Sequence, residues 1–322
     1  MAVSRLIIAA ALAASAVCCA ADPFVVTDRY PVARIFAPPA PTSAAFEPSA
    51  TTSFSVATDW SSSATVSAKS GERLVLDGET VGVTGRWAWH TGGWRIGVDV
   101  PLLYQSGGVL DGFIDGFHEL FNFPEGDRPD LAQDALVYAY RRNDGSALDV
   151  RGTSKGLGDV SLHAGRALVQ GDGRQLAWRV HLKLPTGRSE RLHGSGTVGV
   201  GGSVHGALNR VWWGGAGQWF GGVGAQWHDG SDVLSSIHRP FVASAYAGAQ
   251  WALRPSIVLR GQLDVHSAYY DSELRGLREA AALTLGGDVR LSRRWWLQLA
   301  LIEDIAPRTV PDVVFHINVA RR

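Results

Sequence analysis

Apolar and polar residues alternate along much of the chain after about residue 50. In residues 94–102 every second side chain, from Trp94 to Leu102, is apolar, and the side chains between them are small or polar. Successive side chains of a strand point to opposite faces, so this pattern predicts a strand with one apolar and one polar side. The same pattern recurs in 176–184, 257–266 and 313–319.

Two folds could use such strands. A sandwich buries the apolar face, whereas a membrane barrel turns that face to lipid and the polar face to a lumen. The segments run about 9 to 12 residues, which is the length that crosses a bilayer at a tilt. Tight turns such as "HTGGW" alternate with long polar loops such as "HDGSDVLSSIHRP", and tryptophans gather at segment ends. These features favour a barrel.

The pattern predicts an all-β fold: a closed antiparallel transmembrane β-barrel of about twelve strands, with one short amphipathic helix at about 110–122 in a long loop. Residues 131–143 either extend a strand or form a loop. The predicted strands lie near 50–60, 76–90, 94–105, 157–169, 176–186, 195–209, 212–227, 239–251, 256–266, 277–291, 295–303 and 311–320.

The N-terminus has the layout of a secretory signal peptide, with one Arg, an apolar run and then small residues. We expect residues 1–21 to be removed, together with Cys18 and Cys19, which are the two cysteines of the chain. A membrane anchor would need a longer run, and a lipoprotein would need a better lipobox. Residues 22–48 are proline-rich and aperiodic, which predicts an extended segment before the barrel at 49–322.

The segment "LDGFIDGFHELFNF", residues 110–123, breaks the strand pattern with apolar residues at helical spacing. Three interpretations are open: a helix packed on the barrel with solvated acids, a plug that narrows the lumen, or an ion or catalytic cluster of Asp111, Asp115 and His118. A single helix face supplies few good metal ligands, so we predict no metal site. The candidates for the loop helix or plug are Asp111, Phe113, Asp115, Phe117, His118 and Glu119.

The polar faces of the predicted strands supply the candidates for the lumen lining. Both charge signs occur among them, and opposite charges on neighbouring strands more often brace a barrel wall than bind a ligand. The candidates are Arg86, Arg95, Asp99, Arg179, His181, Lys183, Arg260, Gln262, Asp264, His266, Gln298, Asp304, His316 and Asn318.

No enzyme motif stands out. The nearest nucleophile–base groupings are His266 with Ser267 and Asp271, and His163 with Ser161, and the sequence has no G-x-S-x-G elbow. The glycines at 197–202 lie in a predicted strand rather than before a helix, which argues against a nucleotide site. We therefore predict no catalytic residues and no cofactor, and the net charge of zero argues against nucleic acid as a partner.

Several blocks together resemble an uncharacterised family of Gram-negative outer-membrane barrels that carries only the label domain of unknown function 3187. The blocks are "ERLVLDGET", "SGGVLDGFIDGFHELF", "GLGDVSLHAG", "LKLPTG", "HSAYYDSEL" and "EDIAPRTVPDVVFH". The resemblance covers most of residues 30–320 and implies an outer-membrane barrel, with no activity or ligand attached. Barrels of this type usually end in an aromatic residue, whereas this sequence ends in Arg321 and Arg322.

Three short motifs are similar, more weakly, to barrels thought to pass aromatic compounds of the phenol meta-pathway. They are "GLGD" at 156–159, "LPTG" at 184–187 and "GSGT" at 194–197. Together these features predict a narrow passive channel for small, in part apolar or aromatic, molecules. A structural or surface-interaction barrel and a lipid-modifying enzyme are the alternatives. The expected location is the outer membrane after Sec-type export, with membrane lipid, the barrel-assembly machinery and a small apolar solute as partners.

Overall fold

The computed structural model describes residues 22–46, 50–112, 114, 116, 131–212, 215–305 and 309–321. Within these residues fifteen strands form one antiparallel sheet. The strands are β1 (Thr51–Lys69), β2 (Glu72–Thr91), β3 (Trp94–Ser106), β4 (Val137–Arg142), β5 (Ala147–Arg151), β6 (Ser154–Leu157), β7 (Ser161–Gly171), β8 (Arg174–Lys183), β9 (Gly199–Trp212), β10 (Gly215–His228), β11 (Phe241–Arg254), β12 (Ile257–His266), β13 (Ala280–Arg290), β14 (Trp295–Asp304) and β15 (Val313–Arg321).

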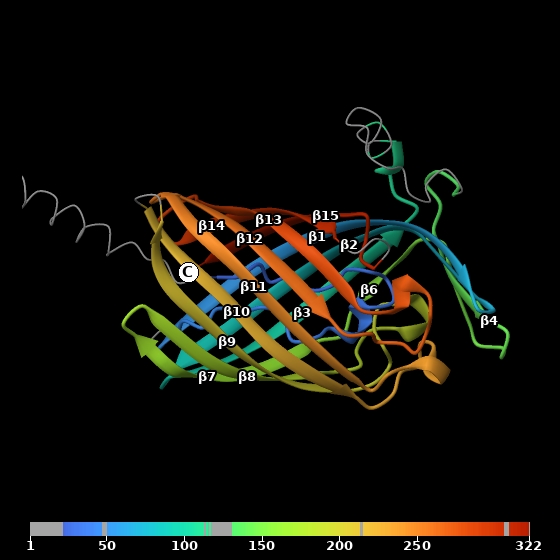
Figure 1. Ribbon diagram of the computed structural model, residues 1–322, viewed down its shortest axis with the longest axis horizontal. Helices are drawn as coiled ribbons and strands as arrows, with labels where there is room; N and C mark the ends of the chain where they lie inside the picture. Colours follow the sequence, from blue (N-terminus) through green and yellow to red (C-terminus); the bar gives the residue numbers. More distant parts are fainter. Residues whose placement is uncertain are drawn as a thin grey trace, which may run out of the picture.

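Twelve of the described strands close into a ring, as the sequence predicted (Figure 1). The chain runs through β1, β2 and β3, continues with β7 and then follows sequence order to β15. Pairing of β15 with β1, from Phe54 opposite Arg321 to Ser62 opposite Val313, closes the ring. Closure leaves no free edge in the wall, which a sheet in lipid requires because unpaired backbone groups cannot be hydrated there.

The two faces of the wall have opposite character. Outward side chains such as Leu285, Ile96 and Ile317 are apolar yet 55%, 47% and 47% exposed. Inward neighbours such as Thr284, Gln262 and His316 are polar and buried. An apolar belt of this extent would be unstable in water but is well solvated by lipid. No helix in the described ranges is long and apolar enough to cross a membrane.

The two ends of the barrel differ. At one end, here called the tight-turn end, hairpins such as Gly92–Gly93, with φ of 56° and 77°, join neighbouring strands directly. At the other end, the long-loop end, the connections are longer, as the sequence predicted. Exposed tryptophans mark the tight-turn end, where the rings of Trp87 and Trp89 stack 5.3 Å apart. Such a girdle is typical of a membrane interface.

The wall is taller on one side than the sequence predicted. β1 and β2 continue past the other strands at the long-loop end, where the Glu72–Asp77 part of β2 pairs with β4, and β4 pairs with β5 (Figure 1). The sequence predicted this strand only to about residue 60, and the residues that follow, "SSSATVSA", are mostly small and polar. These small polar residues are held by the full register with β2, which runs from Thr51 to Lys69. Residues 131–143, left open between strand and loop, contain β4.

An apolar core caps the long-loop end. It combines Leu74 and Leu76 of β2 and Tyr138 and Tyr140 of β4 with side chains from the long loops. The loop members come chiefly from 229–240, which includes the short helix η5 (Ser235–Ile237), and from 267–279, which includes η6 (Arg275–Leu277). Each loop thus has an apolar side that it buries over the barrel opening.

A charge at the middle of the outward face should destabilise the barrel. Leu285 is at the centre of β13 and points outward, so Leu285→Arg should lower the free energy of unfolding by about 2–4 kcal/mol. Urea unfolding in lipid vesicles, followed by tryptophan fluorescence, would measure this. Val169→Arg, near the tight-turn end of β7, is the matched control and should cost about 0–1 kcal/mol. Equal effects at both positions would contradict the assignment of the lipid-facing belt.

Candidate functional site

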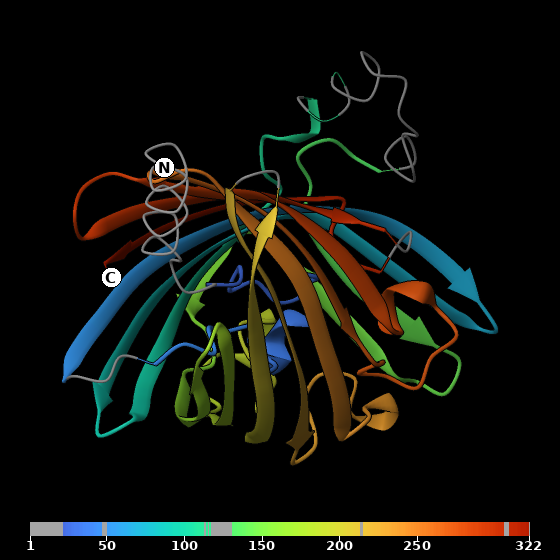
Figure 2. The same ribbon diagram turned by 60° about the vertical axis from the view of Figure 1, so that its left-hand side comes forward.

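The N-terminal residues 22–46 run inside the ring (Figure 2). They enter at the tight-turn end and first follow β12. The backbone N–H of Phe24 donates to Gln262 Oε1 at 2.9 Å, and Gln262 Nε2 donates back to the Phe24 carbonyl at 3.1 Å. The ring of Phe24 also lies beneath the guanidinium of Arg260, 4.9 Å away. We call residues 22–46 the lumenal segment.

Ion pairs fix the first part of the lumenal segment, residues 22–29, to the barrel wall. We call these residues the rising limb. Asp28 Oδ2 lies 3.0 Å from His266 Nε2 on β12. Arg29 Nη2 lies 2.7 Å from Asp59 Oδ2 on β1, and the other Asp59 oxygen is 2.6 Å from His316 Nδ1. These charges are nearly or fully buried, where pairing compensates for the lost hydration.

The apex of the lumenal segment fits into the apolar cap. Residues 30–37 turn through the short helix η2 (Arg34–Phe36), after which Ala37 takes a left-handed conformation with φ 42°. Phe36 is fully buried and stacks on Tyr269, with ring centroids 4.7 Å apart and planes 9° from parallel. Tyr30 packs against Gly276, where a Cβ would lie 2.9 Å from the tyrosine ring. The cap and the apex therefore close the long-loop end together.

The returning limb, residues 38–46, is held by fewer contacts. Pro39 rests on Gly201 of β9, where an added Cβ would lie 3.0 Å from the proline ring. The Thr42 carbonyl accepts a hydrogen bond from the Tyr246 hydroxyl at 3.0 Å. Gln170, at the tight-turn end of β7, binds the backbone on both sides of Ala45. Both ends of the lumenal segment thus leave through the tight-turn end.

The helix expected at about 110–122 starts on the outward side of the wall. Glu79, which shares the outward face of β2 with Trp87, accepts hydrogen bonds from the backbone N–H groups of Val109 and Leu110 at 2.8 and 2.5 Å. Asp111 accepts from Asp134 N at 2.9 Å, which ties the two ends of the loop together. Figures 1 and 2 show this helical turn beyond the ring. Phe113, Asp115, Phe117, His118 and Glu119 lie outside the described residues.

The lumen is instead filled by the lumenal segment, which the sequence analysis treated only as an extended leader to the barrel. Phe24 and Asp28 contact β12 more than 230 residues away in the sequence, Arg29 contacts Asp59 on β1, and Phe36 packs under the loops. No local pattern in a proline-rich stretch signals such contacts. The sign available in the sequence is the group of aromatic residues Phe24, Tyr30 and Phe36 in a proline-rich stretch.

All the lumen-lining candidates are on the inward face, but most are already bound to other groups. Arg260 forms an ion pair with Asp288 at 3.0 Å, and Gln298 donates to the same aspartate. Asp304 accepts from Thr309 N and so orders the loop after β14. Gln262, Asp264, His266, His316 and Asn318 also have hydrogen-bonding partners within the barrel. Arg86, Arg95, Asp99, Arg179 and His181 line cavities, as do the bonded Gln298 and Asn318.

Two connected cavities lie between the lumenal segment and the wall formed by β1, β2, β3, β7 and β8, with β14 and β15 also lining the larger one. The larger, of about 480 Å³, is at the tight-turn end and is lined by Asp22, Thr42, His90, Arg95 and Gln298 among others. The smaller, of about 100 Å³, lies further in, beside Arg29, Pro39, Asp159 and His181. Arg86, Asp99, His163 and Arg179 line both, so they mark the junction. We call the two cavities together the chamber.

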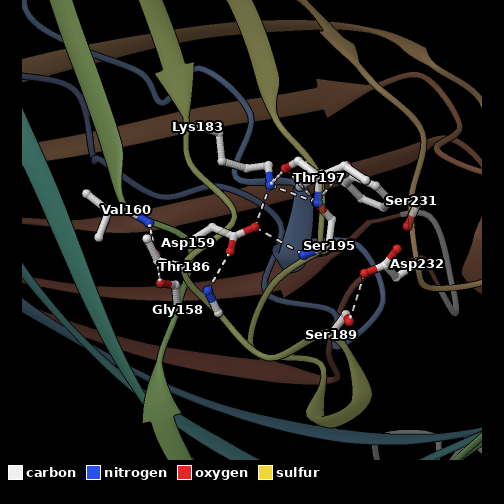
Figure 3. A network of polar contacts seen from close by, with 12 residues as sticks. Gly158, Asp159, Val160, Lys183, Thr186, Ser189, Ser195, Thr197, Ser231 and Asp232 are labelled. Atoms are coloured by element: carbon white, nitrogen blue, oxygen red, sulfur yellow. Dashed lines mark hydrogen bonds and ion pairs between the residues drawn. The ribbon is translucent and has the colours of Figure 1, made fainter.

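Figure 3 shows a polar network around Lys183 at the inner end of the chamber. Lys183 is fully buried and forms an ion pair with Asp159. Its ammonium also donates to Ser195 Oγ and to the Thr197 carbonyl, both at 2.7 Å. Asp159 in turn accepts from the backbone N–H groups of Gly187 and Ser195 at 2.8 and 3.1 Å. Every strong polar group at this centre therefore has a partner.

This network joins the three glycine-rich motifs seen in the sequence. "GLGD" supplies Asp159, "LPTG" supplies Gly187 and follows Lys183, and "GSGT" supplies Ser195 and Thr197. The glycines are needed for close approach, because a Cβ on Gly194 would lie 2.1 Å from an Asp159 oxygen. The motifs thus pin the loop 184–198 to the wall, and Lys183 is a structural residue rather than a free lumenal charge.

His193, in the same loop, is kept neutral. Burial, together with the nearby Arg188, lowers the pKa of His193 to about 4. Its Nε2 lies 2.9 Å from the hydroxyl of Ser154, which donates to Gln105. The neutral ring closes the wall of the smaller cavity without adding charge.

Among the described residues, His266 does not join the Ser267 hydroxyl and Asp271 into a catalytic grouping. His266 Nδ1 faces the carbonyl oxygen of Ser267, while the Ser267 hydroxyl accepts from the backbone N–H of Ala243. The other ring nitrogen of His266, Nε2, lies 3.0 Å from Asp28 Oδ2. Among the described residues no group of three or more His, Cys, Asp or Glu side chains is arranged to hold a metal ion.

A family model described as "Protein of unknown function (DUF3187)" matches residues 1–322. The chain belongs to this family. The membership agrees with the resemblance drawn from the sequence blocks. A comparison of this DUF3187 protein with curated protein sequences found no match.

Solved structures similar to the DUF3187 barrel are outer-membrane proteins. The COG4313 outer membrane channel from Pseudomonas putida F1 aligns with a TM-score of 0.55 at 15% identity, covering 86% of this chain and 96% of that one. The NanC porin aligns with a TM-score of 0.47 at 8% identity, covering 84% and 99%. The CymD monoaromatic hydrocarbon channel gives 0.40 at 10%, covering 94% and 98%. At these identities the likeness concerns the fold, which is that of barrels from Gram-negative outer membranes.

Proposed function

We propose that this DUF3187 protein is a narrow diffusion channel of the outer membrane for small, in part apolar, solutes, and that its own lumenal segment closes it. The chamber carries the proposal. It is open at the tight-turn end and is lined by inward polar residues, as a solute path would be. It ends beneath the apex of the lumenal segment and the apolar cap. The fold shared with the COG4313 outer membrane channel supports the same function.

The distribution of contacts indicates how the channel opens. The apex is fixed by stacking and burial, and the rising limb by two ion pairs. The returning limb has only a few hydrogen bonds and the contact of Pro39 with Gly201. Movement of the returning limb away from β9 would widen the chamber at the lowest energetic cost.

The route to the membrane is part of the proposal. Residues 1–21 would direct Sec-type export and be removed, and the barrel-assembly machinery would insert the strands. The exposed apolar belt supports direct contact of the wall with membrane lipid.

Solute uptake by liposomes containing the purified full-length chain tests the proposal. We expect uptake above that of protein-free liposomes, and uptake should fall steeply as solutes grow larger. A disulfide between Pro39→Cys and Gly201→Cys, made in a chain with Cys18→Ser and Cys19→Ser, supplies the matched control. The oxidised pair should reduce uptake several-fold, and reduction should restore it. Absence of uptake in both states would favour a structural or surface-interaction barrel.

A further inference from the structure

Three arginines lie at the junction of the chamber or next to it in the larger cavity. They come from the same side of the wall, with Arg86 on β2, Arg95 on the adjacent β3, and Arg179 on β8, which is separated from β3 by β7. The larger cavity is lined by all three, and the smaller cavity by Arg86 and Arg179. They are therefore positioned on the path that any solute takes from the tight-turn end inward.

Strand register and two glycines bring these side chains together. Gly165 of β7 is opposite Arg95 on one side and opposite Arg179 on the other. A Cβ at Gly165 would lie 2.5 Å from the Trp178 carbonyl and 3.4 Å from Arg179 Cβ. Gly97 of β3 likewise leaves room for His163, whose Nε2 would lie 2.3 Å from a Cβ there. The wall is thus hollowed where the arginines need space.

Few anionic groups balance the arginines. Arg86 Nε is 3.8 Å from Asp99 Oδ2, and His163 shares the same carboxylate at 4.0 Å. Arg86 also donates to the Val25 carbonyl at 3.1 Å, and Arg95 makes one long contact of 3.5 Å with Thr42 Oγ1. Within the described part of the chain, Arg179 has no hydrogen bond or ion pair. Counting Arg321 at the mouth, four arginines and two aspartates line the larger cavity.

Several buried polar atoms around this junction lack a hydrogen-bond partner. Within the described residues these are the donors Arg86 Nε and Nη1 and Arg95 Nε, together with His181 Nε2 and one acceptor, Asp99 Oδ1. A buried donor without an acceptor is costly, and guanidinium groups bind carboxylates in a two-point geometry. The junction therefore offers both the charge and the directed donors that a carboxylate needs.

The surroundings restrict the size and polarity of the ligand. Next to the arginines, the smaller cavity of about 100 Å³ is bordered by the apolar side chains of Val25, Pro39, Pro101 and Leu103. A compact apolar group would fit there while its charged end remained at the junction. A large group would exceed the volume of the smaller cavity, and a second charge would lie against its apolar side chains.

We propose that Arg86, Arg95 and Arg179 form a binding site for the carboxylate of a small organic anion with a compact apolar body. As a transport specificity this rests on the proposed channel function, whereas binding can be measured without it. The solute that the channel selects would be an amphiphilic acid rather than a neutral apolar molecule.

Calorimetry on the detergent-purified full-length chain tests the site directly, with benzoate and its uncharged analogue benzyl alcohol as probes. Benzoate should bind saturably and benzyl alcohol should not. Arg179→Gln should weaken benzoate binding about tenfold or more, because one charge-assisted bond is lost. Arg254→Gln, at an exposed position outside the chamber, should leave binding unchanged. Equal binding of both probes, or no effect of Arg179→Gln, would overturn the site.

Two further measurements keep the outcomes separate. Arg95→Gln repeats the test near the mouth in case the Arg179 variant fails to fold, which heat-modifiable gel mobility would reveal. Liposome uptake of benzoate and benzyl alcohol then tests transport. Binding of benzoate without any uptake would sustain the site and refute the channel. Equal uptake of both probes without benzoate binding would support the channel and refute the binding site.

Discussion

Deleting residues 22–46 should convert a nearly closed barrel into an open pore with a several-fold higher single-channel conductance. These residues occupy the lumen from the tight-turn end to the cap, and the ring itself closes through β1 and β15 without them. Recordings in planar bilayers would measure the change. The deletion also leaves Asp59 without Arg29 and His266 without Asp28. Heat-modifiable mobility must therefore show that the shortened barrel is folded.

A single substitution tests whether weaker attachment of the lumenal segment, without its deletion, is enough to open the pore. Phe36→Ala removes the ring that stacks on Tyr269 but keeps every strand contact of the limbs. Burial of a phenylalanine is worth about 3–5 kcal/mol against alanine, so the apex should detach more often. Open events should become more frequent while their conductance stays below that of the deletion. Identical conductance traces for the wild type and both variants would show that the lumenal segment is not the barrier.

Asp159→Asn should cause a large loss of stability, of about 3–5 kcal/mol in the free energy of unfolding. The change leaves the Lys183 ammonium fully buried without its counter-ion, held only by Ser195 and the Thr197 carbonyl. Urea unfolding in lipid vesicles would measure it. Because the loss comes from an unpaired charge, the double variant Asp159→Asn with Lys183→Met should recover most of it.

An exposed ion pair provides the control for this prediction. Arg278 and Glu279 are 2.9 Å apart but roughly half exposed, so Glu279→Gln should change the free energy of unfolding by less than about 1 kcal/mol. If the double variant at 159 and 183 is as unstable as Asp159→Asn alone, the hydrogen bonds to Gly187 and Ser195, rather than the charge, hold the loop.

The wall of the barrel could be predicted from the sequence because its determinant is local. A period of two along each strand separates lipid-facing residues such as Ile317 from inward residues such as His316, whatever the partner strand is. The lumen-lining candidates could therefore be chosen from the inward face of each strand. The pattern could not show which of these residues face open space, since that depends on partners such as Asp288 for Arg260.

The closure of the lumen could not be predicted in the same way. Phe24 binds Gln262, which is 238 residues away in the sequence. No periodicity in "DPFVVTDRYPVARIFAPPAPT" indicates which strand this segment contacts. The meeting of Asp159, Lys183 and Ser195 is an intermediate case. The three glycine-rich motifs were visible, but only the pairing of β7 with β8 and of β8 with β9 shows that they converge.

The lumenal segment enters and leaves the barrel through the tight-turn end, so it is a folded-back loop that does not pass through the ring from one end to the other. No chain end has to travel through the ring for it to dock, and the twelve strands can be completed around an empty bore beforehand. The same geometry allows it to be withdrawn toward the tight-turn end while every interstrand hydrogen bond stays intact. The geometry therefore allows the wall to assemble and the bore to close as two separate events.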